Sequence, residues 1–177
     1  HLNPGTGSAM IITTDVGANP MGMAIADLEI DGDLDLVVAN HDDDSVSVLF
    51  FDTTSNTFNE TAFAVSDGPS DVGIGDFIHT SMGPDFAVAC TNANSVEVFG
   101  NQYTSNPPFT QVGSVYASSP SGIEPGDVGD TKDLDDYVIT STNTNDVYLR
   151  DGDGLGGVYG MLYTPVDVGS MPVAQAV

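Results

Sequence analysis

The stretch Pro20-Met-Gly-Met-Ala-Ile-Ala-Asp27 decides the fold, because its layout recurs along the chain. The related stretches are Pro69-Ser-Asp-Val-Gly-Ile-Gly-Asp76 and Ile123-Glu-Pro-Gly-Asp-Val-Gly-Asp130, and Pro172 begins a fourth copy. Starts at 20, 69, 123 and 172 are spaced by 49, 54 and 49 residues. A repeat near 50 residues predicts a propeller or an array of similar units.

Each unit continues with short apolar runs separated by Gly, Asn, Asp, Ser and Pro, and no long stretch has the helical period. The sequence therefore predicts an all-β chain. Second strands are expected at 35–40, 85–90 and 136–141, third strands at 45–50, 95–99 and 146–149, and fourth strands from near Phe58, Phe109 and Tyr159. Four antiparallel strands per unit correspond to one propeller blade.

The expected organisation is a β-propeller-like array of about three full blades, with terminal strands that complete neighbouring blades. Its parts are 1–19 (outer strand of a preceding or neighbouring blade), 20–68 (first blade, with an acidic loop), 69–122 (second blade), 123–170 (third blade) and 171–177 (first strand of a next or neighbouring blade). Three blades do not close a ring, and open β-edges need partners. Either missing sequence or other copies of the chain, exchanging terminal strands, would supply those partners.

The composition is globular but very acidic. Of 177 residues 40% are hydrophobic and 16% charged, yet 26 acids face only Lys132 and Arg150, for a net charge of -24. Such a surface repels nucleic acids and anionic membranes, and no apolar run is long enough for a membrane span. Cys90 is the only cysteine, which excludes an internal disulfide and a Cys-rich zinc site. Asp-rich, Lys-poor chains suit calcium-containing or salty surroundings, so we expect an extracellular or cell-surface protein.

A metal loop is predicted in the first blade, at Asp27-Leu-Glu-Ile-Asp-Gly-Asp-Leu-Asp35. Calcium takes six to eight oxygens, and a glycine at the sixth position lets the loop fold back around the ion. The expected ligands are the side chains of Asp27, Glu29, Asp31 and Asp35 and the carbonyl of Asp33, with water. An EF-hand would need a glutamate at the twelfth position, where this chain has Val38. The alternative is a solvated acidic turn, which leaves five crowded carboxylates without a counterion.

The chain resembles the FG-GAP/VCBS repeat family. The resemblance rests on the repeat near fifty residues, on this acidic loop, on the Leu-Val-Val-Ala-Asn that follows it and on the Val-Ser-Val-Leu strand. The resemblance implies a calcium-binding β-propeller like those of integrin α subunits. It also implies a role in adhesion, assembly or carbohydrate contact at a surface. It spans essentially the whole chain, but only the first copy has the full motif.

The other copies depart from that motif. The loop from Asp76 to Asp85 keeps only its end acids, so we predict no calcium there. The loop from Asp130 to Asp136 places Lys132 where an acid is expected, and its ammonium either replaces the cation or is an ordinary exposed lysine. The acids at Asp42–Asp44, Asp151 and Asp153 are further cation candidates, with solvated turns as the favoured interpretation.

Enzymatic chemistry finds little support in the sequence. A copper site on His1 with His79 and Tyr163 is disfavoured, because His79 falls in a degenerate loop. No hydrolase elbow, phosphate loop or zinc-type His/Glu pair occurs, and Cys90 matches small residues in the other second strands. We therefore predict a protein that is not an enzyme, with polysaccharide cleavage as the less favoured alternative.

One modification site is predicted at Asn59-Glu-Thr61, an N-glycosylation sequon at the start of an outer strand. Together these features predict an extracellular, calcium-stabilised structural or assembly protein, a subunit or segment of a larger surface assembly or fibril. The alternative is a calcium-dependent adhesion module that binds carbohydrate or a surface protein.

Overall fold

The computed structural model describes residues 11–78, 82–102, 108–126, 136–150 and 166–167. These residues form twelve β-strands and one 3-10 turn, η1 (His41–Asp43). The strands are β1 (Pro20–Ala26), β2 (Asp35–Asn40), β3 (Ser45–Asp52), β4 (Thr57–Ala64), β5 (Pro69–Gly75), β6 (Asp85–Cys90), β7 (Ser95–Asn101), β8 (Phe109–Tyr116), β9 (Pro120–Gly126), β10 (Asp136–Ser141), β11 (Asp146–Arg150) and β12 (Val166–Asp167). The predicted all-β class is confirmed. No described helix is long and apolar enough to cross a membrane.

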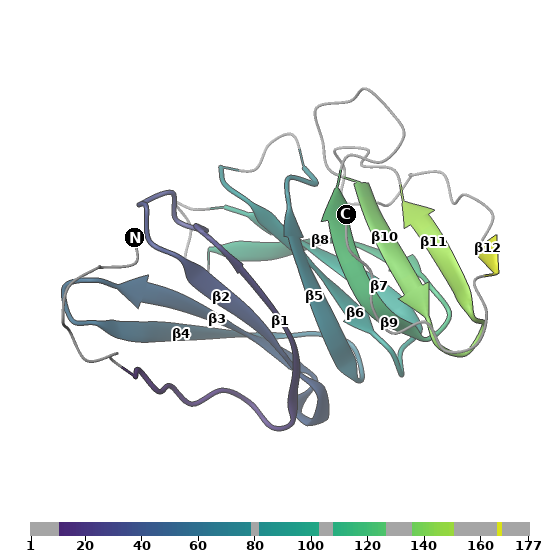
Figure 1. The fold of residues 1–177 in the computed structure, drawn as a ribbon, viewed down its shortest axis with the longest axis horizontal. Coiled ribbons are helices and arrows are strands. Elements are labelled where there is room, and N and C mark those ends of the chain that lie inside the picture. The colour runs from purple at the N-terminus through teal and green to yellow at the C-terminus, as the bar shows by residue number, and fades with distance from the viewer. Residues whose placement is uncertain (1–10, 79–81, 103–107, 127–135, 151–165, 168–177) are drawn as a thin grey trace.

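The strands form three four-stranded antiparallel sheets, in the orders β1-β2-β3-β4, β5-β6-β7-β8 and β9-β10-β11-β12. We call them the first, second and third sheets. Their first strands adjoin one another, β5 beside β1 and β9 beside β5 (Figure 1). The later strands of each sheet lie progressively farther from this row, which is the arrangement of propeller blades.

The third sheet begins three residues earlier than its sequence repeat indicates. Pro20 pairs with Asn40 and Pro69 pairs with Cys90, and the equivalent partner of Ser141 is Pro120, not Ile123. The expected start at Ile123 is therefore wrong as a strand boundary. Strand register is set by ladder pairing, and a three-residue slip would turn the apolar set of β9 to the other face.

Alternation along the strands gives each sheet two apolar faces. We call the face toward the following sheet the front face and the face toward the preceding sheet the rear face. Val37 and Ala39 on the front of the first sheet pack with Phe86 and Val88 on the rear of the second. The next junction repeats this packing, where Ala87, Ala89, Ile123, Tyr137 and Ile139 share one buried cluster.

Aromatic rings reinforce the junction between the first and second sheets. Phe86 and Phe99 stack with centroids 4.7 Å apart, and Phe109 lies 4.8 Å from Phe86. Phe63, from the outer strand β4, meets all three rings edge-on at 6.0–6.3 Å. Burial of such rings is a main source of stability in a β-protein of this size.

The predicted terminal strands are only partly within the described residues. Residues 11–16, expected in an outer strand spanning 8–16, are not in a strand. The fourth strand of the third sheet is Val166–Asp167, paired with β11, and the expected start near Tyr159 lies outside the described residues. Residues 171–177 also lie outside them.

Candidate metal loop and its surroundings

The acidic loop joins β1 to β2, as the sequence predicts, and its own carboxylates organise it. Asp27 accepts hydrogen bonds from the backbone N–H groups of Asp31 (3.0 Å) and Gly32 (2.9 Å). Asp31 accepts one from the N–H of Asp33 at 3.0 Å. Gly32 takes the left-handed conformation (φ 95°), the sharp turn for which a glycine is expected.

Asp35 connects the loop to the third strand of its sheet. It is buried at the start of β2, where Oδ2 accepts the N–H of Leu28 and Oδ1 accepts the N–H of Phe51, both at 2.9 Å. These contacts close the β1–β2 hairpin against β3. Asp35 therefore has a structural role that is independent of a metal.

Asp85 plays the same part in the second sheet, although its loop has lost the intermediate acids. Its carboxylate accepts the N–H groups of Phe77 (2.9 Å), Ile78 (3.0 Å) and Asn101 (2.9 Å). Its side chain is buried, and burial raises the pKa of this carboxyl to about 6. The sequence places Asp85 at the end of a degenerate loop and at the start of a second strand, but does not by itself assign it this backbone-binding role. The recurrence of an aspartate at 35, 85 and 136, each opening a second strand, is the signal that identifies the role.

The loop carboxylates are close enough to repel one another. The pKa of Glu29 is raised by partial burial and then by the charges of Asp35, Asp31 and Asp27. The pKa of Asp35 is raised chiefly by burial, against the hydrogen bonds from Phe51 and Leu28, with further repulsion from Asp31 and Asp27. A cation at this place would relieve this repulsion.

The donor chemistry of the loop fits calcium, whereas its present geometry is not a closed coordination shell. Within the described parts of the chain, no three His, Cys, Asp or Glu side chains are arranged to hold a metal ion. An oxygen that accepts one backbone N–H keeps a second lone pair, so the bonds of Asp27 and Asp35 do not preclude ligation. The side chains of Asp27, Glu29, Asp31 and Asp35 and the carbonyl of Asp33 are the groups that would hold the ion, and calcium would supply charge neutralisation there.

A hollow of about 490 Å³ lies beside this loop, between the ends of the first two sheets. Its lining combines apolar side chains with one acid and comprises Ala26, Ile30, Ile74, Gly75, Asp76, Met82, Gly83 and Pro84. Ile30 and Met82 are exposed. The hollow is thus a place where a ligand would meet apolar surface next to carboxylates.

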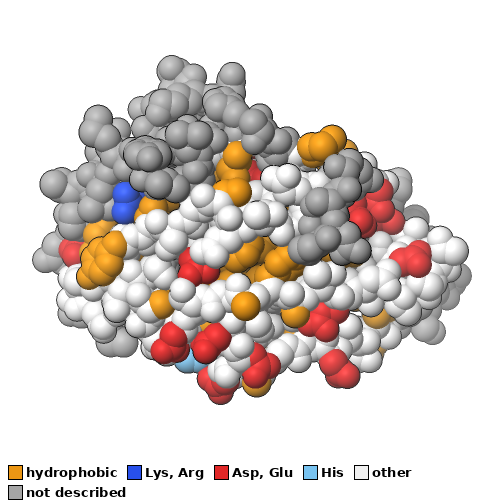
Figure 2. Space-filling view, turned by 180° about the vertical axis from the view of Figure 1, so that it is seen from behind, with side chains coloured by type: hydrophobic (Ala, Val, Ile, Leu, Met, Phe, Trp, Pro, Cys, Tyr) orange, Lys and Arg blue, Asp and Glu red, His pale blue; other side chains and the backbone are white. Residues whose placement is uncertain are grey.

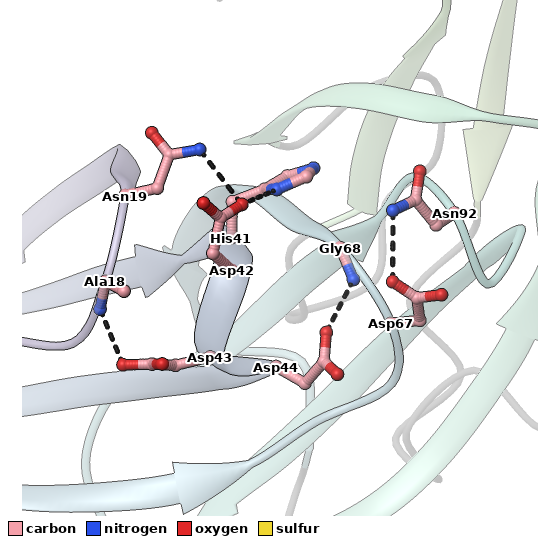
Figure 3. Close-up of polar contacts among 9 residues, drawn as sticks. All are labelled: Ala18, Asn19, His41, Asp42, Asp43, Asp44, Asp67, Gly68 and Asn92. Carbon is pink, nitrogen blue, oxygen red and sulfur yellow. Dashed lines mark hydrogen bonds and ion pairs between the residues drawn. The ribbon is translucent and has the colours of Figure 1, made fainter.

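At the opposite ends of the strands, the acids of the β2–β3 turn bind neighbouring segments (Figure 3). Asp43 accepts the N–H of Ala18 at 2.6 Å, and Asp42 accepts a bond from Asn19 Nδ2 at 3.1 Å. Asp44 accepts the N–H of Gly68 at 3.0 Å, which ties the first sheet to the chain entering β5. These contacts explain the run Asp42–Asp44 as a structural turn. Acidic side chains are also plentiful along one edge of the molecule (Figure 2).

Two other predicted features have clear surroundings. Asn59 is exposed on β4, the outer strand of the first sheet, so a glycan at the sequon would not disturb the core. Cys90 is buried, and burial raises the pKa of its thiol to about 12. That thiol is therefore unreactive at neutral pH.

The remaining candidates, His1, His79, Lys132, Asp151, Asp153 and Tyr163, lie outside the described residues.

Comparison with known proteins establishes the fold alone. No family model matches the chain, and no curated protein matches it. Among solved structures, it is similar to a crystal structure of BBS1N in complex with ARL6DN, soaked with lead, with a TM-score of 0.55 and 16% sequence identity. The match covers 90% of this chain and 42% of that chain, so this chain spans less than half of the β-propeller protein it resembles. The fold is β-propeller-like, and the described strands do not form a closed ring.

Proposed function

We propose that the chain is an extracellular, calcium-stabilised structural unit of the FG-GAP/VCBS type, built into a larger surface assembly or fibril. One observation carries the assembly role: the three described sheets stand in an open row. A propeller is stable when its blades close on one another, so an open row calls for further sheets or strands. Terminal strands passed between copies, or supplied by missing sequence, would complete the neighbouring blades. The high acidity and the exposed sequon at Asn59 support a surface location.

The calcium part rests on the mutual repulsion within the loop from Asp27 to Asp35. Calcium should raise the melting temperature relative to chelator, and Glu29→Gln should abolish most of that gain. In chelator the same variant should be slightly more stable than the wild type, by a few tenths of a kcal/mol, because one repelling charge is gone. Thermal unfolding of both proteins with calcium and with chelator measures both effects.

The control for this experiment is Asp15→Ala, which removes an exposed acid far from the loop in sequence. It should keep the full calcium response. Identical melting of the wild type in calcium and in chelator would contradict the calcium role.

Assembly is tested by light scattering and negative-stain imaging of the wild type beside a chain that ends at residue 170. Filaments or large rings formed by the wild type, and lost in the shortened chain, would support completion by terminal strands. A compact monomer in calcium and in chelator, at every concentration, would contradict the assembly role.

The hollow beside the acidic loop favours a second candidate function, calcium-dependent adhesion to carbohydrate or protein. A ligand there would contact Ile30 and Met82 while a calcium ion neutralised the nearby acids. Binding on a glycan array that requires calcium and is lost in Met82→Asp would favour this function over a purely structural one.

A further inference from the structure

Leu28 is the fixed point of the acidic loop, although its own side chain is not a ligand. That side chain is 1% exposed, in the core shared by the first and second sheets. The N–H of Leu28 donates to Asp35 Oδ2 at 2.9 Å, and its carbonyl accepts a hydrogen bond from Asn101 Nδ2 at 2.8 Å. Leu28 stands between Asp27 and Glu29, two of the expected ligands. Because peptide groups are planar and rigid, the orientation of these two groups sets the directions in which both side chains leave the loop.

The donor to that carbonyl comes from the second sheet. Asn101 ends β7 and is 1% exposed. Its backbone N–H donates to Asp85 at 2.9 Å. Its side-chain amide reaches the carbonyls of Leu28 and Pro84, at 2.8 and 3.1 Å. Phe51 has the equivalent place in the first sheet and donates its N–H to the aspartate of that sheet in the same way. The backbone bond therefore needs no asparagine, and the amide of Asn101 is an addition that reaches the neighbouring sheet.

Gly83 leaves the space through which this amide reaches the loop. A Cβ built on Gly83 would lie 2.9 Å from Asn101 Nδ2 and 3.1 Å from the carbonyl oxygen of Leu28. Both distances are shorter than ordinary van der Waals contact, so a side chain at this position would push the amide away from the carbonyl. The contact between the sheets thus depends on two residues of the second sheet, one that donates and one that makes room.

Ile30 has a backbone conformation that needs support from its surroundings. Its φ is 56°, in the left-handed region that a β-branched residue rarely adopts, and such a conformation persists only where neighbouring structure holds it. The side chain is 64% exposed, so its own packing contributes little. Hydrogen bonds hold the backbone on either side: the N–H of Asp31 binds Asp27, and the carbonyl of Leu28 binds Asn101. Loss of the Asn101 bond would leave this turn held on one side only.

We propose that Asn101 is a positioning residue for the calcium site, which from the second sheet holds the backbone of the loop from Asp27 to Asp35 in place for the ion. This deepens the proposed calcium role and rests on it. A loop that is already held loses less conformational freedom when the ion binds, so its affinity is higher. The coupling is reciprocal, because whatever the contact contributes to calcium binding, calcium contributes to the contact. Calcium bound to the first sheet should therefore also stabilise the junction with the second sheet.

The first test is calorimetric titration of the protein with calcium alone, at constant ionic strength. Asn101→Ala removes the amide and keeps the backbone N–H that binds Asp85. Gly83→Ala keeps every polar group and adds the methyl that displaces the amide. Each variant should bind calcium at least about ten-fold more weakly than the wild type. The control is Val98→Ala, which truncates a buried residue of the same strand as Asn101. It should lower the melting temperature and leave the calcium affinity unchanged.

The second test is amide hydrogen exchange with calcium and with chelator. The N–H of Phe77 donates to Asp85, which also binds the backbone of Asn101, so this amide reports on the second sheet's side of the contact. Calcium should slow its exchange several-fold in the wild type and have no effect in Asn101→Ala. The amide of Thr91, which donates to the carbonyl of Gly68 at the other end of β6, should be unaffected in both proteins.

The outcomes separate this proposal from the calcium role itself. If the wild type binds calcium and the Asn101→Ala and Gly83→Ala variants bind it equally tightly, the role of Asn101 is wrong and the calcium site stands. Equal weakening by Val98→Ala would mean that affinity only follows overall stability, which also overturns the proposal. A wild type that does not bind calcium overturns both. Since the two substitutions act on one contact from different residues, either folded variant is sufficient for the test.

Discussion

The aspartate that opens each second strand links the loop chemistry to the fold. Asp35 and Asp85 each accept backbone N–H groups from the preceding loop and from the third strand. In the first sheet, the additional acids turn this structural site into a candidate cation site. In the second sheet, the loop has lost those acids and only the structural role remains.

Asp85→Ala should cost about 3 kcal/mol of unfolding free energy, because three backbone N–H groups lose their buried acceptor. Urea unfolding at pH 7 measures the loss. Asp15→Ala, which removes an exposed aspartate, should change stability by less than about 0.5 kcal/mol. Equal effects of the two substitutions would show that the Asp85 contacts contribute little.

The raised pKa of Asp85 gives this site a defined pH dependence. Since its folded pKa is about 6 and its ordinary value is 3.8, the folded state holds the proton more tightly than the unfolded state does. Its contribution to stability is therefore fully present below about pH 4 and is lost as the pH rises through 6. The penalty of Asp85→Ala should shrink between pH 4 and pH 7, by up to roughly 3 kcal/mol. A penalty that grew over this range would contradict the raised pKa.

At the scale of elements, the junction between sheets depends on aromatic packing. Phe63 reaches from the outer strand of the first sheet onto the rings of Phe86, Phe99 and Phe109 in the second. Phe63→Ala should lower the free energy of unfolding by about 3 kcal/mol. This value is near the lower end of the range for replacing a phenylalanine by alanine, because the ring is only half-buried. Tyr116→Ala on the exposed side of β8 should be nearly neutral. Chemical unfolding of both variants measures these effects. If the sheets were independent of one another and shared no core, Phe63→Ala would also leave stability nearly unchanged.

The second strands could be predicted from sequence because their apolar runs are long and begin at an aspartate. Strands β2, β6 and β10 span the residues expected. Strand β9 could not be placed the same way, because the tetrapeptide Asp-Val-Gly-Asp130 imitates the end of the repeat three residues too late. The pairing of Pro120 with Ser141 shows the correct register, which the sequence also carries: Pro120-Ser-Gly-Ile-Glu-Pro-Gly-Asp127 matches the first two and last two residues of the stretch from Pro69 to Asp76. The backbone-binding role of Asp85 is evident only with the strands in place, because the N–H groups that it accepts come from its loop and from β7.

At the scale of the whole molecule, 26 acidic side chains oppose compaction and association alike. Near neutral pH two copies of the chain repel each other, so any contact between copies must overcome a long-range electrostatic barrier. Salt screens all exposed charges alike and so lowers that barrier, since the Debye length falls from about 30 Å at 0.01 M to about 3 Å at 1 M ionic strength. Calcium at the loop would act locally and at much lower concentration.

This difference yields a prediction that separates screening from site binding. Raising sodium chloride from about 10 mM to about 500 mM should increase the melting temperature gradually. The increase should be the same in the wild type and in Glu29→Gln, because both carry nearly the same net charge. Calcium added at constant ionic strength should produce a further, saturable increase in the wild type only. If Glu29→Gln showed the same saturable increase, the calcium effect would belong to general neutralisation of the acidic surface, and the loop from Asp27 to Asp35 would be no more than a hairpin closed by its own carboxylates.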